Sequence, residues 1–457
     1  MDDALFAALV VLLAWVPFWF GGNRPVAWGL NALLFSLLLA AHEIGLAVRR
    51  LPYPVAPRRI ALSIAGMGTL VAFALIQALA PVPTAWAPAL WPAAADALGR
   101  PVAAALSVDP DGTLLAVLRL LPALIAFWLA LQLCRSAPRA RRLLNALALI
   151  SGAYALYGIV ALLWFPHTLL WFEKVDYVGY ATSTFINRNS YATYAGMGAL
   201  TGIAALSAHL ARVGETGAGG WRGLLSAFLL RGAGLPLLVS LAVVANVAAL
   251  MLAASRGGFA AAMIGLCVFL AAQFLKRGAR LRAAVLIALA LPVLAVVAAH
   301  FDDALTRRVT GAGLVDPLRL AIVRLTATTL SDQPWTGFGY GTFEEVFRIY
   351  RDAGVAGRFV IDKAHNTYAE LAQGVGLPVF LIAIGAQLLL VSRCIRGFLK
   401  RRRNAEFPLL AVAVSVLVGG HALVDFSIQM QAVAVTFAAV LGMGVAQSWS
   451  QTQSVAG

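Results

Sequence analysis

The stretch Lys363-Ala364-His365-Asn366-Thr367-Tyr368-Ala369-Glu370 ends a long polar segment and opens a run of about 21 mostly apolar residues, enough to span a bilayer as a helix. Thr367 and Glu370 have the T-x-x-E spacing of a capping box, which predicts that the helix begins at Thr367. His365 and Asn366 then lie just outside a helix N-terminus at a membrane surface, where exposed N–H groups and the helix dipole favour an anion. A neutral histidine there can accept a proton. The plainer alternative is a surface histidine beside a capping asparagine.

The composition of the 457 residues is that of a membrane protein. The chain is 61% hydrophobic and 12% charged, with a mean hydropathy of +0.84, which is more apolar surface than a soluble chain can bury. The net charge of +15 does not indicate nucleic-acid binding, because the basic residues fall in short clusters between apolar runs. No cleavable signal peptide is expected, since the first apolar run lacks a basic n-region and is long enough to span. Cys134, Cys267 and Cys394 lie outside the predicted outer loops, so no disulfide framework is implied.

Apolar runs predict an all-α polytopic membrane protein with about twelve transmembrane helices. Their approximate limits are 4–21, 27–47, 60–80, 113–134, 143–165, 191–211, 235–255, 258–275, 283–301, 367–391, 407–424 and 431–448. Basic residues gather in every second loop: Arg49, Arg50, Arg58 and Arg59; Arg135, Arg139, Arg141 and Arg142; Arg212, Arg222 and Arg231; Lys276, Arg277, Arg280 and Arg282; and Arg393, Arg396, Lys400, Arg401, Arg402 and Arg403. These loops and both termini are therefore expected in the cytoplasm.

Three long segments are expected on the opposite, outer side. The first, 81–112, contains the D-x-D pattern Asp109-Pro110-Asp111, for which a turn or an N-cap at Asp111 is a better interpretation than a metal site, because a span follows directly. The second, 166–190, carries aromatic residues typical of a membrane interface. The third, 302–364, has 63 residues and is too long for a structureless loop.

The third segment contains signals for two short amphipathic helices. Asp316-Pro317 provides an N-cap and a proline at the first helical position. A second helix is predicted to open at Thr342, with Glu345 completing a capping box. Such helices lie on the lipid surface or cover a cavity. Gly337-Phe338-Gly339-Tyr340-Gly341 precedes the second helix and is interpreted as a glycine-rich turn, because it lacks the strand and the Lys-Ser/Thr of a nucleotide loop.

These boundaries divide the chain into three parts. Residues 1–301 hold transmembrane helices 1–9, residues 302–366 form the long outer loop with short helices, and residues 367–457 hold helices 10–12.

Unusual polar residues collect at the outer ends of the predicted spans. Asn187-Arg188-Asn189 precedes the sixth span, and Ser255-Arg256-Gly257-Gly258 splits one apolar stretch into two spans. An arginine at this depth is costly unless it is paired or in a wet cavity, and its guanidinium fits phosphate oxygens. Snorkelling to lipid head groups is the alternative. His421 and Asp425 end the eleventh span on the same side, and Asp425 is expected to pair with one of the arginines or with His421.

Several of these motifs together resemble those of the O-antigen ligase and O-antigen polymerase superfamily. They are Arg256-Gly257-Gly258, Arg319, Gly337-x-Gly339-x-Gly341, His365-Asn366 and Gly374-x-Gly376-Leu377, with Asn187-Arg188-Asn189 and His421-Ala422-Leu423-Val424-Asp425-Phe426 resembling motifs of some members. The resemblance covers roughly residues 180–430. It implies a multi-spanning glycosyltransferase of the C type (GT-C) in the bacterial inner membrane. The implied reaction moves a glycan from undecaprenyl diphosphate to an acceptor hydroxyl at the periplasmic face, without a cofactor or metal.

Under this interpretation each candidate residue has an expected role. His365 deprotonates the acceptor hydroxyl or binds phosphate, and Arg188, Arg256 and Arg319 bind the diphosphate. The supporting residues are Asn187, Asn366, His421 and Asp425. A lipid A-core acceptor defines a ligase, which we favour; a lipid-linked glycan acceptor defines an O-antigen or exopolysaccharide polymerase, and a protein acceptor defines a protein O-oligosaccharyltransferase. The competing class is a polysaccharide transporter or flippase, which predicts ionisable residues near the bilayer midplane rather than at one face.

Overall fold

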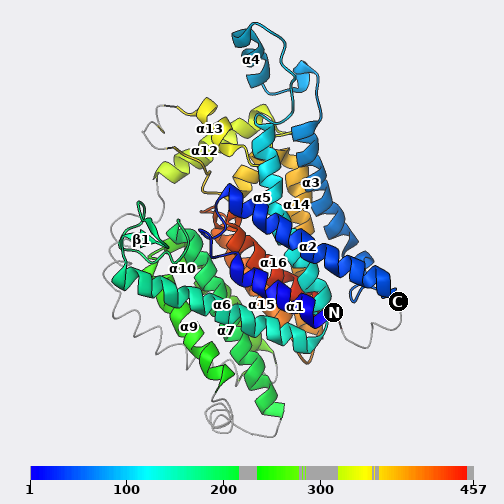
Figure 1. Cartoon of the computed structure of the whole chain (residues 1–457), viewed down its shortest axis with the longest axis vertical. Coiled ribbons are helices and arrows are strands. Elements are labelled where there is room, and N and C mark those ends of the chain that lie inside the picture. The colour runs from blue at the N-terminus through cyan, green and yellow to red at the C-terminus, as the bar shows by residue number, and fades with distance from the viewer. Residues whose placement is uncertain are drawn as a thin grey trace.

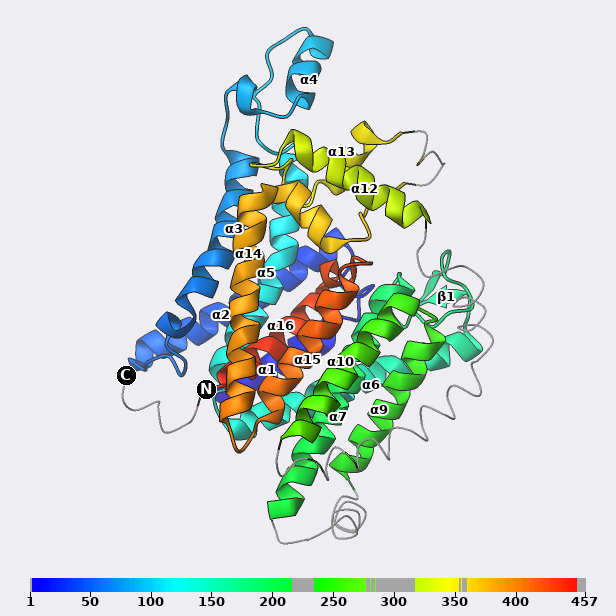
Figure 2. The same ribbon diagram turned by 180° about the vertical axis from the view of Figure 1, so that it is seen from behind.

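The computed structural model is a bundle of long helices with a small two-stranded sheet at one side (Figures 1 and 2). It describes residues 2–215, 234–276, 317–352 and 360–449, and positions 280, 284 and 355. The described helices are α1 (Asp2–Trp15), α2 (Pro25–Arg49), η1 (Pro57–Ile60), α3 (Ala61–Leu79), η2 (Thr84–Trp86), α4 (Leu90–Leu98), α5 (Pro110–Leu133), α6 (Ala137–Trp164), α7 (Arg188–Glu215), α9 (Leu235–Leu252), α10 (Arg256–Leu275), α12 (Pro317–Asp332), α13 (Phe343–Tyr350), α14 (Thr367–Lys400), α15 (Glu406–His421), η4 (Ser427–Gln429) and α16 (Gln431–Ala446). Strands β1 (Thr168–Leu169) and β2 (Phe172–Glu173) pair antiparallel.

Seven of the described helical segments are long and apolar enough to cross a membrane: α2, η1 with α3, α5, α6, α9, α10 and α14. Each lies at a predicted span. Helices α1, α7, α15 and α16 occupy four further predicted positions without meeting that criterion, and the predicted span 283–301 lies outside the described residues except for position 284. The structure therefore agrees with a mostly helical membrane protein, whereas twelve spans and the GT-C type stay predictions.

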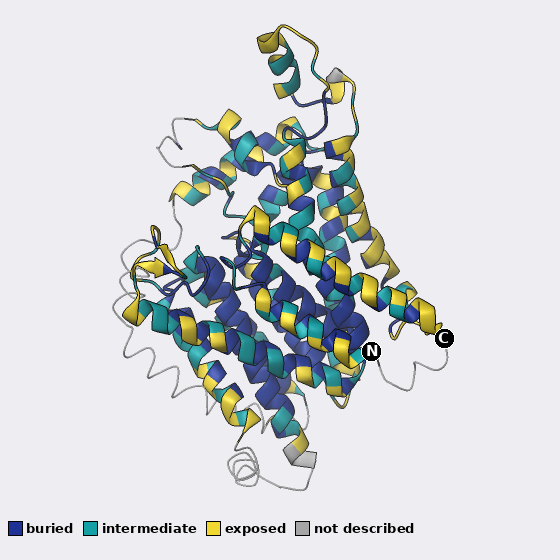
Figure 3. Ribbon diagram, in the orientation of Figure 1, coloured by how far each residue is buried: buried dark blue, intermediate teal, exposed yellow. Residues whose placement is uncertain are grey.

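Helices α7, α15 and α16 form the buried centre of the bundle (Figure 3). From Asn189 to Ala208 nearly every residue of α7 is buried, and the helix packs against α6, α9, α10 and α15. This helix is rich in Ala, Gly, Ser and Thr, small residues that let neighbouring helices approach closely. Its surroundings are protein rather than lipid, which explains why its sequence is less apolar than that of an outer span.

The glycine-rich turn of the outer loop lies against a break in α14. Residues 334–339 exchange backbone hydrogen bonds with residues 373–377, where Gly376 interrupts the helix with a φ of 72°. The buried Gln77 of α3 joins both segments, because its amide donates to a carbonyl in each and accepts the N–H of Tyr340. The interpretation of this stretch as a turn into α13 is confirmed, and the three turn glycines all have positive φ.

Two short helices of the outer loop begin where the sequence predicts, at Pro317 and Phe343. The predicted capping box at Thr342 is wrong, however, since the Thr342 hydroxyl donates to the carbonyls of Phe338 and Gly339 instead of capping α13. The apolar stripe of α13 is buried against α12 and the start of α14, so it covers protein and not lipid.

The D-x-D pattern also caps its helix differently from the prediction. Asp109, and not Asp111, is the N-cap of α5, and its carboxylate accepts the N–H of Gly112 at 3.0 Å. The reason is Pro110, which occupies the first helical position and makes the residue before it the cap.

The break in α14 generates a stability prediction. A β-carbon at Gly376 would collide with the Trp335 carbonyl and force a side chain into a left-handed conformation, so Gly376→Ala is expected to cost about 1–3 kcal/mol. Gly385→Ala is the matched control, because a β-carbon there meets nothing within 4 Å on the same helix. Thermal unfolding of the protein in nanodiscs measures both variants. Equal midpoints for the two would contradict the role of Gly376.

Candidate functional site

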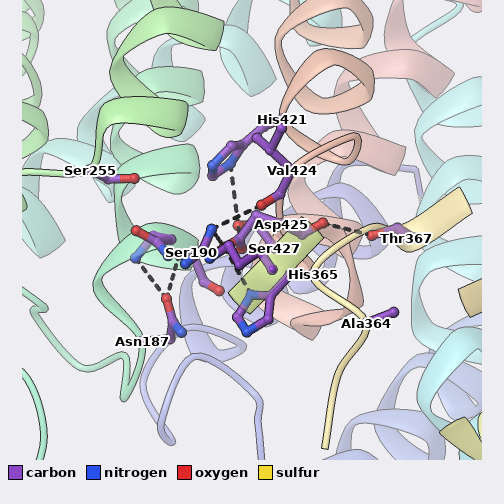
Figure 4. A network of polar contacts seen from close by, with 12 residues as sticks. Asn187, Ser190, Ser255, Ala364, His365, Thr367, His421, Val424, Asp425 and Ser427 are labelled. Carbon is purple, nitrogen blue, oxygen red and sulfur yellow. Dashed lines mark hydrogen bonds and ion pairs between the residues drawn. The ribbon is translucent and has the colours of Figure 1, made fainter. Parts of the chain in front are cut away.

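A buried carboxylate, Asp425, lies at the centre of the polar cluster where α15 ends (Figure 4). Its Oδ1 accepts the Ser427 hydroxyl at 2.6 Å, and its Oδ2 accepts the side-chain amide of Asn189 at 2.9 Å. The guanidinium of Arg319 stands 3.7 Å from Oδ2, and Nδ1 of His365 stands 3.9 Å from the same oxygen. Four segments distant in the sequence therefore meet at one negative charge.

The surroundings keep Asp425 ionised. Burial raises the pKa of this carboxyl, but the approach of His365, the charge of His421, the Ser427 hydroxyl and the charge of Arg319 outweigh burial and lower the pKa to about 2. The carboxylate is therefore negative throughout the physiological pH range. A fixed negative charge beside an imidazole stabilises the cation that forms when the ring accepts a proton.

His365 precedes α14 in an uncommon conformation. Its φ is 52°, which few residues other than glycine adopt, and such strain is often kept at functional sites. The ring packs 5.2 Å from that of Phe426, between centroids, and the side chain is 23% exposed. Because Nδ1 faces the buried carboxylate, the arrangement favours the proton on Nδ1 and leaves Nε2 to accept a proton from a substrate.

The start of α14 is fastened to the end of α15. The Thr367 amide donates to the Ala422 carbonyl at 2.9 Å, and its hydroxyl donates to the Asp425 carbonyl at 3.1 Å. The helix begins at Thr367 as predicted, but its cap is Asn366, which accepts the N–H of Ala369 at 3.0 Å. Thr367 is therefore not the cap of a T-x-x-E box.

Glu370 also acts differently from a capping-box glutamate. Its buried carboxylate reaches back past the cap to the N–H of Ala364, at 3.0 Å, and so fixes the residue before His365.

The start of α7 supplies a second wall of the site. Asn187 caps this helix, since its side-chain oxygen accepts the N–H groups of Asn189 at 2.7 Å and Ser190 at 3.3 Å. Its amide also donates to the Tyr177 hydroxyl at 3.3 Å. Asn189, which is not among the predicted site residues, donates directly to Asp425. The N-x-N spacing was the signal: the first asparagine caps the helix and the second projects from its first turn.

Arg188 lies between these asparagines and is held by aromatic rings. Its guanidinium carbon lies 4.5 Å from the ring centre of Tyr180 and 5.5 Å from that of Tyr177. Such cation–π contacts orient an arginine without neutralising its charge.

The start of α10 closes the cluster from a third side. Ser255 caps the helix by accepting the N–H of Gly258 at 3.2 Å, so Arg256 is its first residue. A β-carbon at Gly257 would meet the ring of His421, and one at Gly258 would meet Ala192 of α7. The two glycines therefore allow α7 and the end of α15 to approach closely beside Arg256.

His421, the last residue of α15, links these walls. Its Nδ1 lies 2.6 Å from the Thr193 hydroxyl of α7 and 3.3 Å from that of Ser427. The expected pairing of Asp425 is with several groups and not with one, because Asn189, Ser427, Arg319 and His365 all approach its side chain.

The structure thus brings together the N-termini of α7, α10 and α14 around residues 421–427. Each helix start adds a partial positive charge to that of the nearby arginines, which suits an anion such as a diphosphate. Arg319 is placed differently from the simple expectation of a phosphate ligand, because its Nη1 donates to the Val424 carbonyl at 3.0 Å beside Asp425. Among the described residues no group of three or more His, Cys, Asp and Glu is arranged to hold a metal ion.

Comparison with protein families matches part of the chain. A family model described as O-antigen ligase matches residues 241–384, a segment that contains Arg256, Arg319 and His365. Arg188 and Asp425 lie outside the matched segment, and their inclusion in the candidate site rests on the structure alone. No curated protein matches the chain. The resemblance seen in the sequence is confirmed over residues 241–384, whose match to the O-antigen ligase model supports the O-antigen ligase superfamily.

Proposed function

We propose that this protein is an O-antigen ligase, which transfers a glycan from undecaprenyl diphosphate to a hydroxyl of a lipid A-core oligosaccharide at the periplasmic face of the inner membrane. The observation that carries the proposal is a partly exposed imidazole, His365, held against the buried Asp425 at a junction of three helix N-termini. The family match supports the class of reaction. The choice of a lipid A-core acceptor is part of the proposal.

The proposed chemistry is a single displacement with inversion at the anomeric carbon. Nε2 of His365 takes the proton of the acceptor hydroxyl as its oxygen attacks that carbon. The bond between the sugar and the diphosphate oxygen breaks, and the electron pair leaves with the diphosphate. Asp425 stabilises the imidazolium that forms, as a carboxylate does in a hydrolase triad.

The leaving diphosphate needs positive charge that is fixed before the reaction. Arg188, at the first position of α7, and Arg256, at the first position of α10, supply planar donors that fit phosphate oxygens in pairs. We assign Arg319 a positioning role, because it holds Val424 and faces Asp425. A metal ion is not required in this scheme, since the guanidinium groups and helix termini provide the charge.

Removal of the imidazole tests the base. His365→Ala is expected to lower the rate of glycan transfer by about 10²–10⁴-fold, because general-base catalysis contributes on that order. The measurement is transfer from undecaprenyl-diphosphate glycan by the purified protein in proteoliposomes. His167→Ala, an exposed histidine of the segment 166–190, is the matched control and is expected to keep wild-type activity. Undiminished transfer by a folded His365→Ala variant would remove this residue from the chemistry.

Neutralising the buried carboxylate tests whether Asp425 assists His365. Asp425→Asn keeps the shape but removes the charge, and we expect kcat/KM to fall about 10²-fold or more. The exposed Asp362→Asn variant is the control. A folded Asp425→Asn variant with full activity would argue against a catalytic pair of His365 and Asp425.

The guanidinium shape is tested by Arg256→Lys. Lysine keeps the charge but cannot offer two parallel donors, so transfer is expected to fall about 10²-fold. Arg100→Lys, at an exposed position after α4, should leave transfer unchanged. Equal rates in Arg256→Lys and the wild type would contradict bidentate binding at this position.

The acceptor is identified by the same assay. Lipid A-core, a second lipid-linked glycan and a serine- or threonine-containing peptide are offered separately with one donor. Transfer to lipid A-core alone supports the ligase, whereas elongation of the donor or modification of the peptide would assign the polymerase or the protein O-oligosaccharyltransferase.

A further inference from the structure

A cavity of about 690 Å³ opens beside the site, between the loop that joins α1 to α2 and the β1–β2 hairpin. Its walls include Trp19, Phe20 and Arg24 from the loop, and Phe172 and Lys174 from the hairpin and its exit. The size lies within the range of small-molecule sites and accommodates a saccharide of a few units.

The cavity and the catalytic cluster share a wall. Ile186, which lines the cavity, directly precedes the cap residue Asn187. Nζ of Lys174 donates to the Tyr180 carbonyl at 2.8 Å, and the ring of Tyr180 lies under the guanidinium of Arg188. Tyr180 therefore separates the cavity residue Lys174 from Arg188, which is proposed to bind the donor diphosphate.

The lining combines aromatic faces with charges. The aromatic lining residues are Trp19, Phe20 and Phe172, and the rings of Phe20 and Phe172 lie 5.5 Å apart. Aromatic faces of this kind are suited to the C–H faces of sugars. The charged lining residues are Arg24, Glu173, Lys174 and Asp176. Most of the accessible lining surface is nevertheless apolar.

Lys174 is the residue that points to an anion. Lys174 is buried, with 9% of the residue exposed, and its Nζ donates to the uncharged Tyr180 carbonyl. Burial lowers its pKa to about 8, so its charge is destabilised in the absence of a counter-charge. A phosphate or carboxylate in the cavity would compensate this cost. Arg24, exposed at the edge over the Phe20 ring, offers a second cation at the mouth.

We propose that this cavity is the acceptor subsite and that it binds a saccharide carrying an anionic substituent, with Lys174 and Arg24 contacting the anion. The proposal rests on the proposed function, since it names the place and the chemistry of that acceptor. It assigns the aromatic walls to the sugar rings and leaves the donor to the arginines of α7 and α10.

The first test measures kinetics in proteoliposomes with a phosphorylated lipid A-core acceptor and with the same acceptor after phosphatase treatment. Lys174→Gln keeps a donor for the Tyr180 carbonyl but removes the charge. We expect its KM for the phosphorylated acceptor to rise about tenfold, with an unchanged KM for the donor, because one charge-assisted bond is worth about that factor. With the dephosphorylated acceptor the wild type and the variant should match. Arg24→Gln is expected to act in the same direction, and Arg100→Gln is the control.

The second test does not depend on transfer. Binding of the phosphorylated core oligosaccharide alone, without lipid or donor, is measured by calorimetry on the full-length protein in nanodiscs. Weakening of about tenfold in Lys174→Gln supports the subsite even if no transfer is catalysed. Equal affinities in the wild type, Lys174→Gln and Arg24→Gln would overturn it. Displacement of the oligosaccharide by undecaprenyl monophosphate would also overturn it and assign the cavity to the carrier lipid.

Discussion

The buried charge of Asp425 is the constraint on which the site depends. A carboxylate without water is costly unless several donors and cations surround it, and removing one partner leaves the others unsatisfied. Here the partners come from the start of α7, from η4, from α12 and from the residue before α14. Satisfying this one group therefore fixes the relative positions of four segments, and with them the imidazole and the arginines that flank it.

The arrangement also explains the pairs of small residues near the site. Gly257 lies against His421 and Gly258 against Ala192, so α10 approaches α15 and α7 without intervening side chains. Close packing of this kind brings the N-terminus of α10 near that of α7. Positive charge is then concentrated by backbone geometry as well as by guanidinium groups.

Much of the fold could be predicted from the sequence, because helices that face lipid are apolar and their starts carry strong local signals. The starts at Thr367, Pro317 and Phe343 follow from proline, polar caps and apolar spacing. The N-cap residues were harder to predict, because two suitable residues lie within one or two positions of each other. Asn366 caps α14 in place of Thr367, and Asp109 caps α5 in place of Asp111. Hydropathy alone also underestimates how deeply α7 is buried. A helix surrounded by protein needs small residues more than strongly apolar ones.

The candidate site could be predicted only in part. Arg188 and Arg256 stand out because an arginine at the end of an apolar span is costly unless it is paired, and His365 stands out because it lies just before the start of a span. The role of Asn189 and the cavity beside Lys174 could not be predicted, because both depend on contacts between segments far apart in the chain. The ion-pair geometry of Arg319 is likewise a property of the folded chain.

The seam between residues 334–339 and the break in α14 has a mechanical consequence. The backbone hydrogen bonds, and the two hydrogen bonds that the Gln77 amide donates, attach this end of the outer loop to α14. Lifting the loop here would expose unpaired amides and carbonyls to a low-dielectric border. This end of the loop therefore cannot separate from α14 without breaking that set of bonds.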